Sequence, residues 1–280
     1  MSAVLAPAAN APDDPWRRVA AARRRAVAWL AQGASIVAFV LLWQWLAATH
    51  AKFWLVSFEN VPTPIAAFDA GRDLLDSGKL GRHLGYSLWR VAAGFASAAV
   101  AGMALGLAIG RFAPVRRVLL PPLELLRPIP AVAWIPLAIL MFPSAELSMV
   151  FITFLGALFP VLLNTIHGVE GVDRRLIAAA RSLGTGRWQM FTQVILPAAA
   201  PSIATGLAIG MGTCWFCLVS AEMISGQFGI GYYTWESYTL QSYGGIIVGM
   251  LVIGLLGMGC SALIRLAARL AMPWAAGVAR

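Results

Sequence analysis

The sequence contains little charge for its length. Only 12% of its 280 residues are Asp, Glu, Lys or Arg, whereas about a quarter of the residues of ordinary soluble domains are charged. Hydrophobic residues make up 60% of the chain, and its mean hydropathy is +0.76. The apolar residues fall in long uncharged runs, and about 20 such residues span a bilayer as a helix. This composition excludes a water-soluble globular protein and predicts an all-α polytopic membrane protein.

Lysine and cysteine are nearly absent. Lys52 and Lys79 are the only lysines, so the formal net charge of +9 comes from arginine. The arginines form short clusters between apolar runs instead of one basic stripe, which argues against nucleic-acid binding. Cys214, Cys217 and Cys260 all lie within apolar segments, which excludes a disulfide framework and an exposed reactive thiol.

The sequence also lacks the usual signatures of an enzyme. The Gly-x4-Gly-Lys-Ser/Thr pattern that cradles nucleotide phosphates is missing, and the Gly78-Lys79 pair is followed by Leu80. No His/Cys/Asp cluster has metal-ligand spacing, and no nucleophile lies near a base in the sequence. We therefore expect no catalytic residue, no metal site, no cofactor and no ATPase activity on this chain.

Six apolar stretches are long enough to span a membrane. They cover approximately residues 28–48, 87–110, 122–142, 146–167, 198–222 and 244–266. Basic residues before the first stretch are also typical of a signal peptide, but the uncharged run over 26–51 exceeds an apolar signal region of about 7–15 residues. The third is interrupted by prolines at Pro121, Pro122, Pro128, Pro130 and Pro136. A broken helix at membrane depth must line a cavity or pack against protein.

The predicted organisation has four parts. A tail over 1–25 precedes a segment over 26–84, which holds the first span and a short amphipathic helix on the outer face; a core over 85–270 and a tail over 271–280 follow. An even number of spans places both termini on one side. Arginines mark that side as cytoplasmic, namely Arg17, Arg18, Arg23, Arg24, Arg25, Arg111, Arg116, Arg117, Arg174, Arg175, Arg181, Arg187, Arg265, Arg269 and Arg280.

Small residues four apart predict close helix contacts inside the bundle. They are Gly102, Gly106 and Gly110, the pair Gly206 and Gly210, and the pair Gly245 and Gly249.

The cytoplasmic segment over 168–197 is predicted to contain a pair of short helices. Asp173 is a suitable N-cap and Gly184 a suitable C-terminal stop for the first. Its apolar face comprises Leu176, Ile177, Ala180 and Leu183. The second helix begins near Thr185 and is expected to stop at Leu196-Pro197. The pair either enters a groove on a partner protein or lies on the lipid surface.

The same segment carries a motif. Ala179-Ala180, three residues, Gly184, nine residues, then Val194-x-Leu196-Pro197 resembles the cytoplasmic loop motif of ABC-importer permeases, which reads Glu-Ala-Ala, three residues, Gly, nine residues, Ile-x-Leu-Pro. The resemblance extends over roughly residues 85–270. Further matches to permeases of the nitrate, sulfonate, taurine and bicarbonate type are Leu126-Arg127-Pro128-Ile129-Pro130, Trp134-Ile135-Pro136-Leu137, Phe159-Pro160, Asn164-Thr165, Gly168-Val169 and Ala221-Glu222-Met223.

The resemblance implies a type I ABC importer permease fold with coupling helices that dock on a cytoplasmic ATP-binding subunit. The implied coupling residues are Ala178, Ala179, Ala180, Arg181, Gly184, Arg187, Trp188, Leu196 and Pro197. One departure is that Ala178 replaces the motif's glutamate, so a salt bridge made by that glutamate cannot form here.

The resemblance also implies partners and a location. We expect a second permease copy in a homodimer, two cytoplasmic ATP-binding subunits that carry ATP and Mg, and a periplasmic or lipid-anchored substrate-binding protein. The chain would lie in the bacterial inner membrane, in contact with membrane lipid, and bind no nucleic acid. Substrate would pass by alternating access between two permease copies.

Candidate residues of the translocation path or gate occupy the third to fifth spans. They are Arg127, Pro130, Trp134, Asn164, Thr213, Trp215, Ser220 and Glu222. An ionisable group within a span is a functional candidate by default, and we favour a gate or a structural hydrogen-bonding role for Glu222. Arg127 could attract an anion, although a local pair with Glu124 is favoured because the two lie three residues apart.

Three functions remain open from the sequence. The favoured one is an ATP-driven importer of a small anion such as nitrate, bicarbonate, taurine or another sulfonate, and a vitamin precursor such as a pyrimidine is the alternative cargo within the family. A secondary transporter or channel is less favoured, because no paired buried charges or inverted repeat are evident. A membrane enzyme lacks a recognisable site. Only the importer explains the cytoplasmic helix pair.

Overall fold

A computed structural model of the chain describes residues 15–225 and 228–274. It divides into two compact units, Met1–Ala66 (unit 1) and Ala67–Arg280 (unit 2). Apart from one short hairpin, the regular structure of the described residues is helical, which confirms the all-α prediction. The expected tails over 1–14 and 275–280 lie outside the described residues.

Unit 1 begins with the helix α1, Pro15–Ala48. The predicted first span starts at residue 28, so the helix is longer than expected and includes part of the predicted tail. Alanine and arginine, which dominate residues 15–25, are strong helix formers, and proline suits the first turn of a helix. Residues Ala26–Ala48 are long and apolar enough to cross a membrane.

A hairpin that the sequence analysis did not predict follows α1. Strands β1, Lys52–Phe53, and β2, Val56–Ser57, pair in antiparallel register, with Lys52 opposite Ser57. Lys52 Nζ lies 2.8 Å from Glu59 Oε2, and this hydrogen-bonded cation lowers the pKa of the Glu59 carboxyl.

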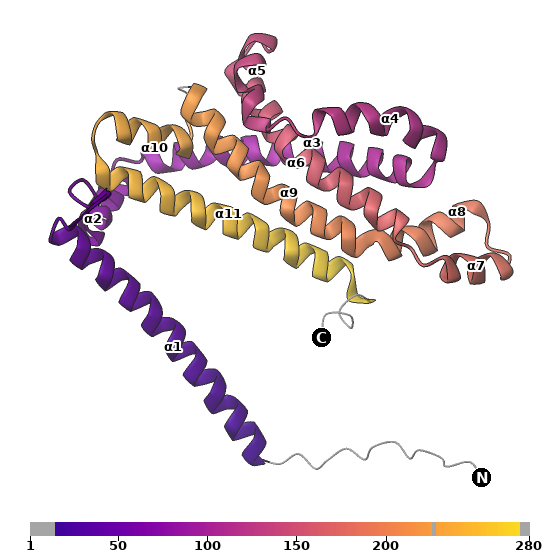
Figure 1. The fold of residues 1–280 in the computed structure, drawn as a ribbon, viewed down its shortest axis with the longest axis horizontal. Coiled ribbons are helices and arrows are strands. Elements are labelled where there is room, and N and C mark those ends of the chain that lie inside the picture. Colours follow the sequence, from indigo (N-terminus) through magenta and orange to yellow (C-terminus); the bar gives the residue numbers. More distant parts are fainter. Residues whose placement is uncertain (1–14, 226–227, 275–280) are drawn as a thin grey trace. The chain divides into compact units, whose positions relative to one another are not determined.

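Unit 2 is a bundle of long helices with short helices at both ends (Figure 1). The long helices are α3, Lys79–Arg111; α6, Ala145–Glu170; α9, Leu196–Ser225; and α11, Tyr243–Ala271. The shorter ones are α2, Pro64–Asp76, which crosses the unit boundary; α4, Ala113–Leu126; η1, Ala131–Trp134; α5, Ile135–Met141; α7, Arg174–Ser182; α8, Arg187–Gln189; η2, Met190–Ile195; and α10, Ile230–Thr239.

The predicted spans agree with the helices, although most bounds shift outward. Across the described residues, five helices could cross a membrane, and a sixth candidate is a broken pair bent by 84°. The helix α3 begins at Lys79, earlier than the predicted 87. The amphipathic outer helix corresponds to α2, which buries Ala67 and Leu74 on one face. The loop expected between the fifth and sixth spans contains the helix α10.

The broken third span is confirmed, but not all five prolines interrupt it. Pro121 and Pro122 lie inside α4 without ending it. Each proline leaves a helix carbonyl without its N–H donor, but no residue of α4 is buried, so these carbonyls are not enclosed in the protein. The break falls after α4, where Pro128 and Pro130 restrict two neighbouring residues. Pro136 lies in the first turn of α5, where a proline removes no helical hydrogen bond.

The second helix of the predicted pair does not stop at Leu196-Pro197, so this prediction from the sequence is wrong. α8, the π-helical segment η2 and α9 form one continuous helical stretch, Arg187–Ser225. The Leu196 N–H donates to Phe191 O, five residues earlier. This wider turn directly precedes Pro197 and relieves the clash of its ring with the preceding carbonyl, which would otherwise break the helix.

The helices α3 and α6 pack at very short range through glycine, as the four-residue spacing predicted. A Cβ built on Gly106 would lie 2.6 Å from Thr165 Cβ and 2.9 Å from Leu162 O. Gly102 and Gly110 face α6 in the same way, through Val161 and Val169. These close contacts hold the bundle together without large side chains between the helices.

Changing Gly106 to alanine is therefore expected to lower the free energy of unfolding by about 1–3 kcal/mol, because the added methyl overlaps both side chain and backbone of α6. Gly85→Ala on the same helix is the matched control. A Cβ there meets nothing within 4 Å, so we expect a gain of about 0.4–1 kcal/mol. Denaturant titration of both variants in detergent measures the difference, and equal stability of the two would contradict the close contact.

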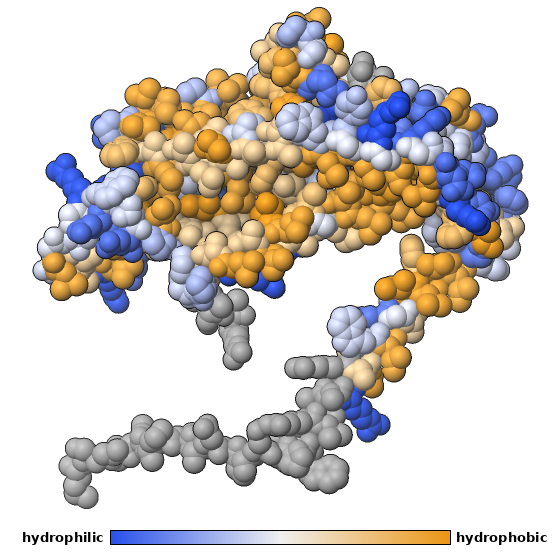
Figure 2. Space-filling model, turned by 180° about the vertical axis from the view of Figure 1, so that it is seen from behind, coloured by the Kyte–Doolittle hydropathy of each residue, from blue (hydrophilic) through white to orange (hydrophobic). Residues whose placement is uncertain are grey.

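The surface of unit 2 has the polarity of a membrane protein. Figure 2 shows hydrophobic side chains over the middle of the long helices and hydrophilic ones gathered toward the ends, on the face drawn. Large apolar side chains on the outside, such as Leu251, Leu255 and Leu263 of α11, are more than half exposed. Lipid tails would cover these side chains in a bilayer.

Candidate functional site

The helix pair α7–α8 lies at one end of unit 2. Its N-terminal cap and the turn between its two helices agree with the sequence prediction. Asp173 Oδ1 accepts a 2.8 Å hydrogen bond from the Arg175 N–H, which caps α7. Gly184 has φ +78°, a left-handed conformation that glycine adopts without strain. The pair lies at the end of the bundle opposite α10 (Figure 1).

Only part of the apolar face of α7 is free. Ile177 and Ala180 pack against a buried cluster that includes Met190 and Ile195, so these side chains hold the pair to the bundle. By contrast, Leu183 is 86% exposed.

Trp188, on the second helix, is 74% exposed, and Arg181, Gly184 and Arg187 are exposed beside it. Ala178 and Ala179 are exposed too, whereas Leu196 and Pro197 are half-buried at the start of α9. The exposed surface of the pair therefore combines three large apolar side chains, Leu176, Leu183 and Trp188, with arginines.

The broken segment encloses a second feature, a cavity of about 430 Å³. Four of the predicted path residues line it, namely Arg127, Pro130, Trp134 and Thr213. Apolar side chains of α6 and α9 form the opposite wall, and Arg127 is the only charged residue of the lining. A cavity beside the broken helix is one of the two arrangements that the prolines predicted, the other being packing against protein.

The predicted Arg127–Glu124 pair is not formed. Both residues are exposed, and no ion pair within the described residues joins them. Arg127 directly follows the last residue of α4, next to the break, and contributes to the cavity wall. Arg127 is therefore a charged residue without an ion pair among the described residues, in a lining that is otherwise uncharged.

Other predicted path residues lie elsewhere. Trp215 and Ser220 line a separate groove of about 690 Å³ between α9 and α11. Asn164 lines neither space, and its Nδ2 donates to Pro160 O at 2.8 Å. Trp215 Nε1 is the one buried side-chain nitrogen or oxygen of the described residues without a hydrogen-bond partner.

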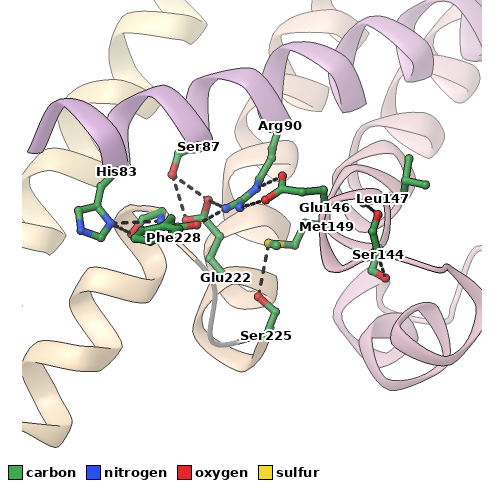
Figure 3. Close-up of polar contacts among 12 residues, drawn as sticks. His83, Ser87, Arg90, Ser144, Glu146, Leu147, Met149, Glu222, Ser225 and Phe228 are labelled. Carbon is green, nitrogen blue, oxygen red and sulfur yellow. Dashed lines mark hydrogen bonds and ion pairs between the residues drawn. The ribbon is translucent and has the colours of Figure 1, made fainter. Parts of the chain in front are cut away.

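Glu222 does not line a cavity but belongs to a buried ionic cluster (Figure 3). Arg90 of α3 and Glu222 of α9 are both 0% exposed, with Nη1 and Oε1 2.8 Å apart. Arg90 Nε also donates to Glu146 Oε2 of α6 at 2.8 Å, and Arg90 Nη1 donates to Phe228 O. One guanidinium therefore joins three long helices and the loop before α10.

Further hydrogen bonds fix that loop to the cluster. Ser87 Oγ donates to Glu222 and accepts from the Ile230 N–H at 2.9 Å. The Gly231 N–H donates to Glu222 Oε2 at 2.9 Å, and His83 Nδ1 lies 2.9 Å from Gly229 O. Both carboxylate oxygens of Glu222 are therefore occupied by hydrogen bonds, while the prediction of a gate or a structural role for Glu222 stays a prediction.

Sequence reasoning missed Arg90, Glu146, Ser87 and His83. It included Arg90 in the second span, 87–110, without giving it a role, and it found no paired buried charges, which the structure contradicts. One available signal was the position of Arg90 within a helix-forming apolar stretch, because a charge there needs a partner. The partner could not be identified, since Glu146 and Glu222 are 56 and 132 residues away.

The described residues contain no group of three or more His, Cys, Asp or Glu side chains that could hold a metal ion. The structural features are thus a helix pair at one end, a cavity beside a broken helix, and a buried ionic cluster toward the other end.

Membrane-length helices, a broken helix beside a cavity and an exposed helix pair define a polytopic helical membrane protein. Residues 98–276 match the family described as binding-protein-dependent transport system inner membrane component, and the chain belongs to this family of ABC-importer permeases. A nitrate import permease protein from Synechocystis sp. is 35% identical over 212 residues, 72% of this chain and 74% of that protein.

Two further relatives extend the comparison. A taurine transport system permease protein from Escherichia coli is 37% identical over 198 residues, 69% of this chain and 71% of that protein. A bicarbonate transport system permease protein from Synechococcus elongatus is 32% identical over 216 residues, 73% of this chain and 75% of that protein. The resemblance drawn from the cytoplasmic motif is thereby confirmed.

Proposed function

We propose that this chain is the membrane-spanning subunit of an ATP-driven importer for a small anion of the nitrate, sulfonate, taurine or bicarbonate class. The observation that carries the substrate class is the cavity beside the broken helix, whose lining holds one charged residue, Arg127. A single guanidinium in an apolar wall attracts an oxyanion and provides planar hydrogen-bond donors. The names of the relatives support the same class.

The energy source is proposed to be a separate chain. Two cytoplasmic subunits would bind ATP and Mg and receive the exposed Leu183 and Trp188, together with Arg181 and Arg187. This chain itself would be non-catalytic, with no cofactor of its own. In this arrangement the α7–α8 pair lies in the cytoplasm and both termini share that side of a bacterial inner membrane.

Alternating access would require two permease copies, paired as a homodimer, with the path between them. ATP binding would draw the nucleotide subunits together and shift the helix pair, which is continuous with α9 through η2. Motion at the pair would therefore reach the wall of the cavity through one helix. A loaded periplasmic or lipid-anchored binding protein would supply substrate at the α10 end.

Reconstitution in lipid vesicles tests the proposal. The chain, a candidate ATP-binding subunit and a binding protein are combined, and uptake of labelled nitrate, bicarbonate and taurine is measured with and without ATP. We expect ATP-dependent uptake of one of these anions. Uptake without the ATP-binding subunit would support a secondary transporter, and ATP-dependent uptake of a pyrimidine alone would contradict the anion class.

Arg127→Gln is expected to reduce anion uptake about tenfold, equivalent to about 1.4 kcal/mol, because the only positive charge of the cavity lining is lost. Arg117→Gln is the control, since Arg117 is exposed on the neighbouring α4 and does not line the cavity. Initial rates of uptake at several substrate concentrations measure the effect. Equal rates for the two variants would remove Arg127 from the path.

A further inference from the structure

A third cavity, of about 500 Å³, lies where α3 ends against the second helix of the cytoplasmic pair. Leu107, Ala108 and Phe112 form one side, and Trp188 and Phe191 form the other. Its volume is within the range of small-molecule sites. The helix pair therefore does not close completely against the bundle.

Two arginines complete this lining, Arg111 and Arg187, and no acidic residue belongs to it. Neither arginine forms an ion pair within the described residues. The Arg111 guanidinium carbon lies 5.8 Å from the centre of the Phe112 ring, a cation–π distance that orients its charge. An occupant should thus carry a negative charge as well as an apolar part.

The position of the cavity along α3 indicates where the apolar and the charged parts of an occupant would lie. Arg111 is the last residue of α3, which is long and apolar enough to span a membrane, while Leu107 and Ala108 lie within its last turn. The lining therefore passes from the apolar part of a span to its charged end within one helical turn. Tryptophan, here Trp188, is typical of this boundary.

We propose that this cavity binds an anionic phospholipid of the cytoplasmic leaflet, with the phosphate between Arg111 and Arg187 and an acyl chain against Leu107, Ala108 and Phe191. Basic pockets between membrane helices on this side suit anionic headgroups. A soluble protein segment suits the cavity less well, because Leu107 and Ala108 lie inside the span. The lipid would contact Trp188 and thereby influence the position of the α7–α8 pair relative to its proposed partner.

Retained lipid tests the proposal. The full chain, without any partner, is reconstituted in vesicles of phosphatidylcholine that contain one fifth phosphatidylglycerol. It is then extracted into mild detergent, and the bound lipid is quantified by native mass spectrometry. We expect the wild-type chain to retain phosphatidylglycerol in preference to phosphatidylcholine. Arg111→Gln and Arg187→Gln should each reduce that retention at least threefold, whereas Arg117→Gln, outside the cavity, should not. Inorganic phosphate at millimolar concentration should not displace the lipid.

A variant that changes no charge tests whether lipid binding also needs the apolar part of the cavity. Ala108→Phe is expected to fill the apolar part and reduce retention to a similar extent, with the helix content unchanged by circular dichroism. The proposal is overturned if Arg111→Gln retains as much phosphatidylglycerol as wild type, if Arg117→Gln loses as much, if both lipids are retained equally, or if free phosphate displaces the lipid. Because no other chain is present, these outcomes are independent of the transport assay.

Discussion

Replacing Arg90 with methionine is expected to lower the free energy of unfolding by about 3–5 kcal/mol, the cost of leaving a buried charge without its partner. Glu222 is 0% exposed and would lose the one cation that pairs with it among the described residues, while Phe228 O would lose a donor. Methionine keeps much of the side-chain volume, so the effect reports charge and hydrogen bonding more than packing. Thermal or denaturant unfolding in detergent measures it.

A double variant tests whether the loss is electrostatic. Arg90→Met combined with Glu222→Gln removes both charges, and the amide oxygen can still accept from the Gly231 N–H. We expect the double variant to be more stable than Arg90→Met alone, with a coupling of at least about 1 kcal/mol in the cycle.

Arg82→Met on the same helix is the control. Arg82 is exposed and lies 5.5 Å from the Phe228 ring, so its loss should cost no more than about 1 kcal/mol. If Arg82→Met were as damaging as Arg90→Met, the cluster would not be what holds α3, α6 and α9 together.

The number and order of the membrane helices could be predicted because each depends on local composition. An apolar run of about 20 residues has one stable solution in a bilayer, so the spans were recognisable without tertiary information. The bounds were less accurate: α3 starts at Lys79, where charged residues extend the helix beyond the apolar run. The continuity through Pro197 depends on a π-helical turn, for which no sequence rule was available.

The same distinction between local and tertiary features decides which sites could be predicted. The turn between α7 and α8 could be predicted because Asp173 and Gly184 act on their immediate neighbours. The cavity was partly predicted, since Pro130, one of the two prolines at the break, lines it, whereas its wall from α6 and α9 is a tertiary feature. The ionic cluster was missed because its members are far apart in sequence and are brought together only by the packing of α3, α6 and α9.

Gly184→Val is expected to uncouple the chain from its ATP-binding subunit. Gly184 has φ +78°, and a Cβ built there meets nothing within 4 Å, so the substitution acts through backbone strain and not through a clash. A left-handed conformation costs a non-glycine residue about 1–2 kcal/mol, or a factor of about 5–30 in the equilibrium ratio of native to non-native turn. The affinity for the proposed nucleotide subunit should fall by up to that factor, in proportion to the fraction of chains that lose the native turn.

Co-purification and ATP hydrolysis in vesicles measure this loss, with Gly184→Asn as the matched control, because asparagine tolerates the left-handed region better than valine does. Asparagine should retain most of the coupled hydrolysis while valine loses it. The bundle itself should remain stable in both, since Gly184 is exposed and lies outside the buried clusters. Full coupling of the valine variant would show that the turn between α7 and α8 does not set the docking geometry.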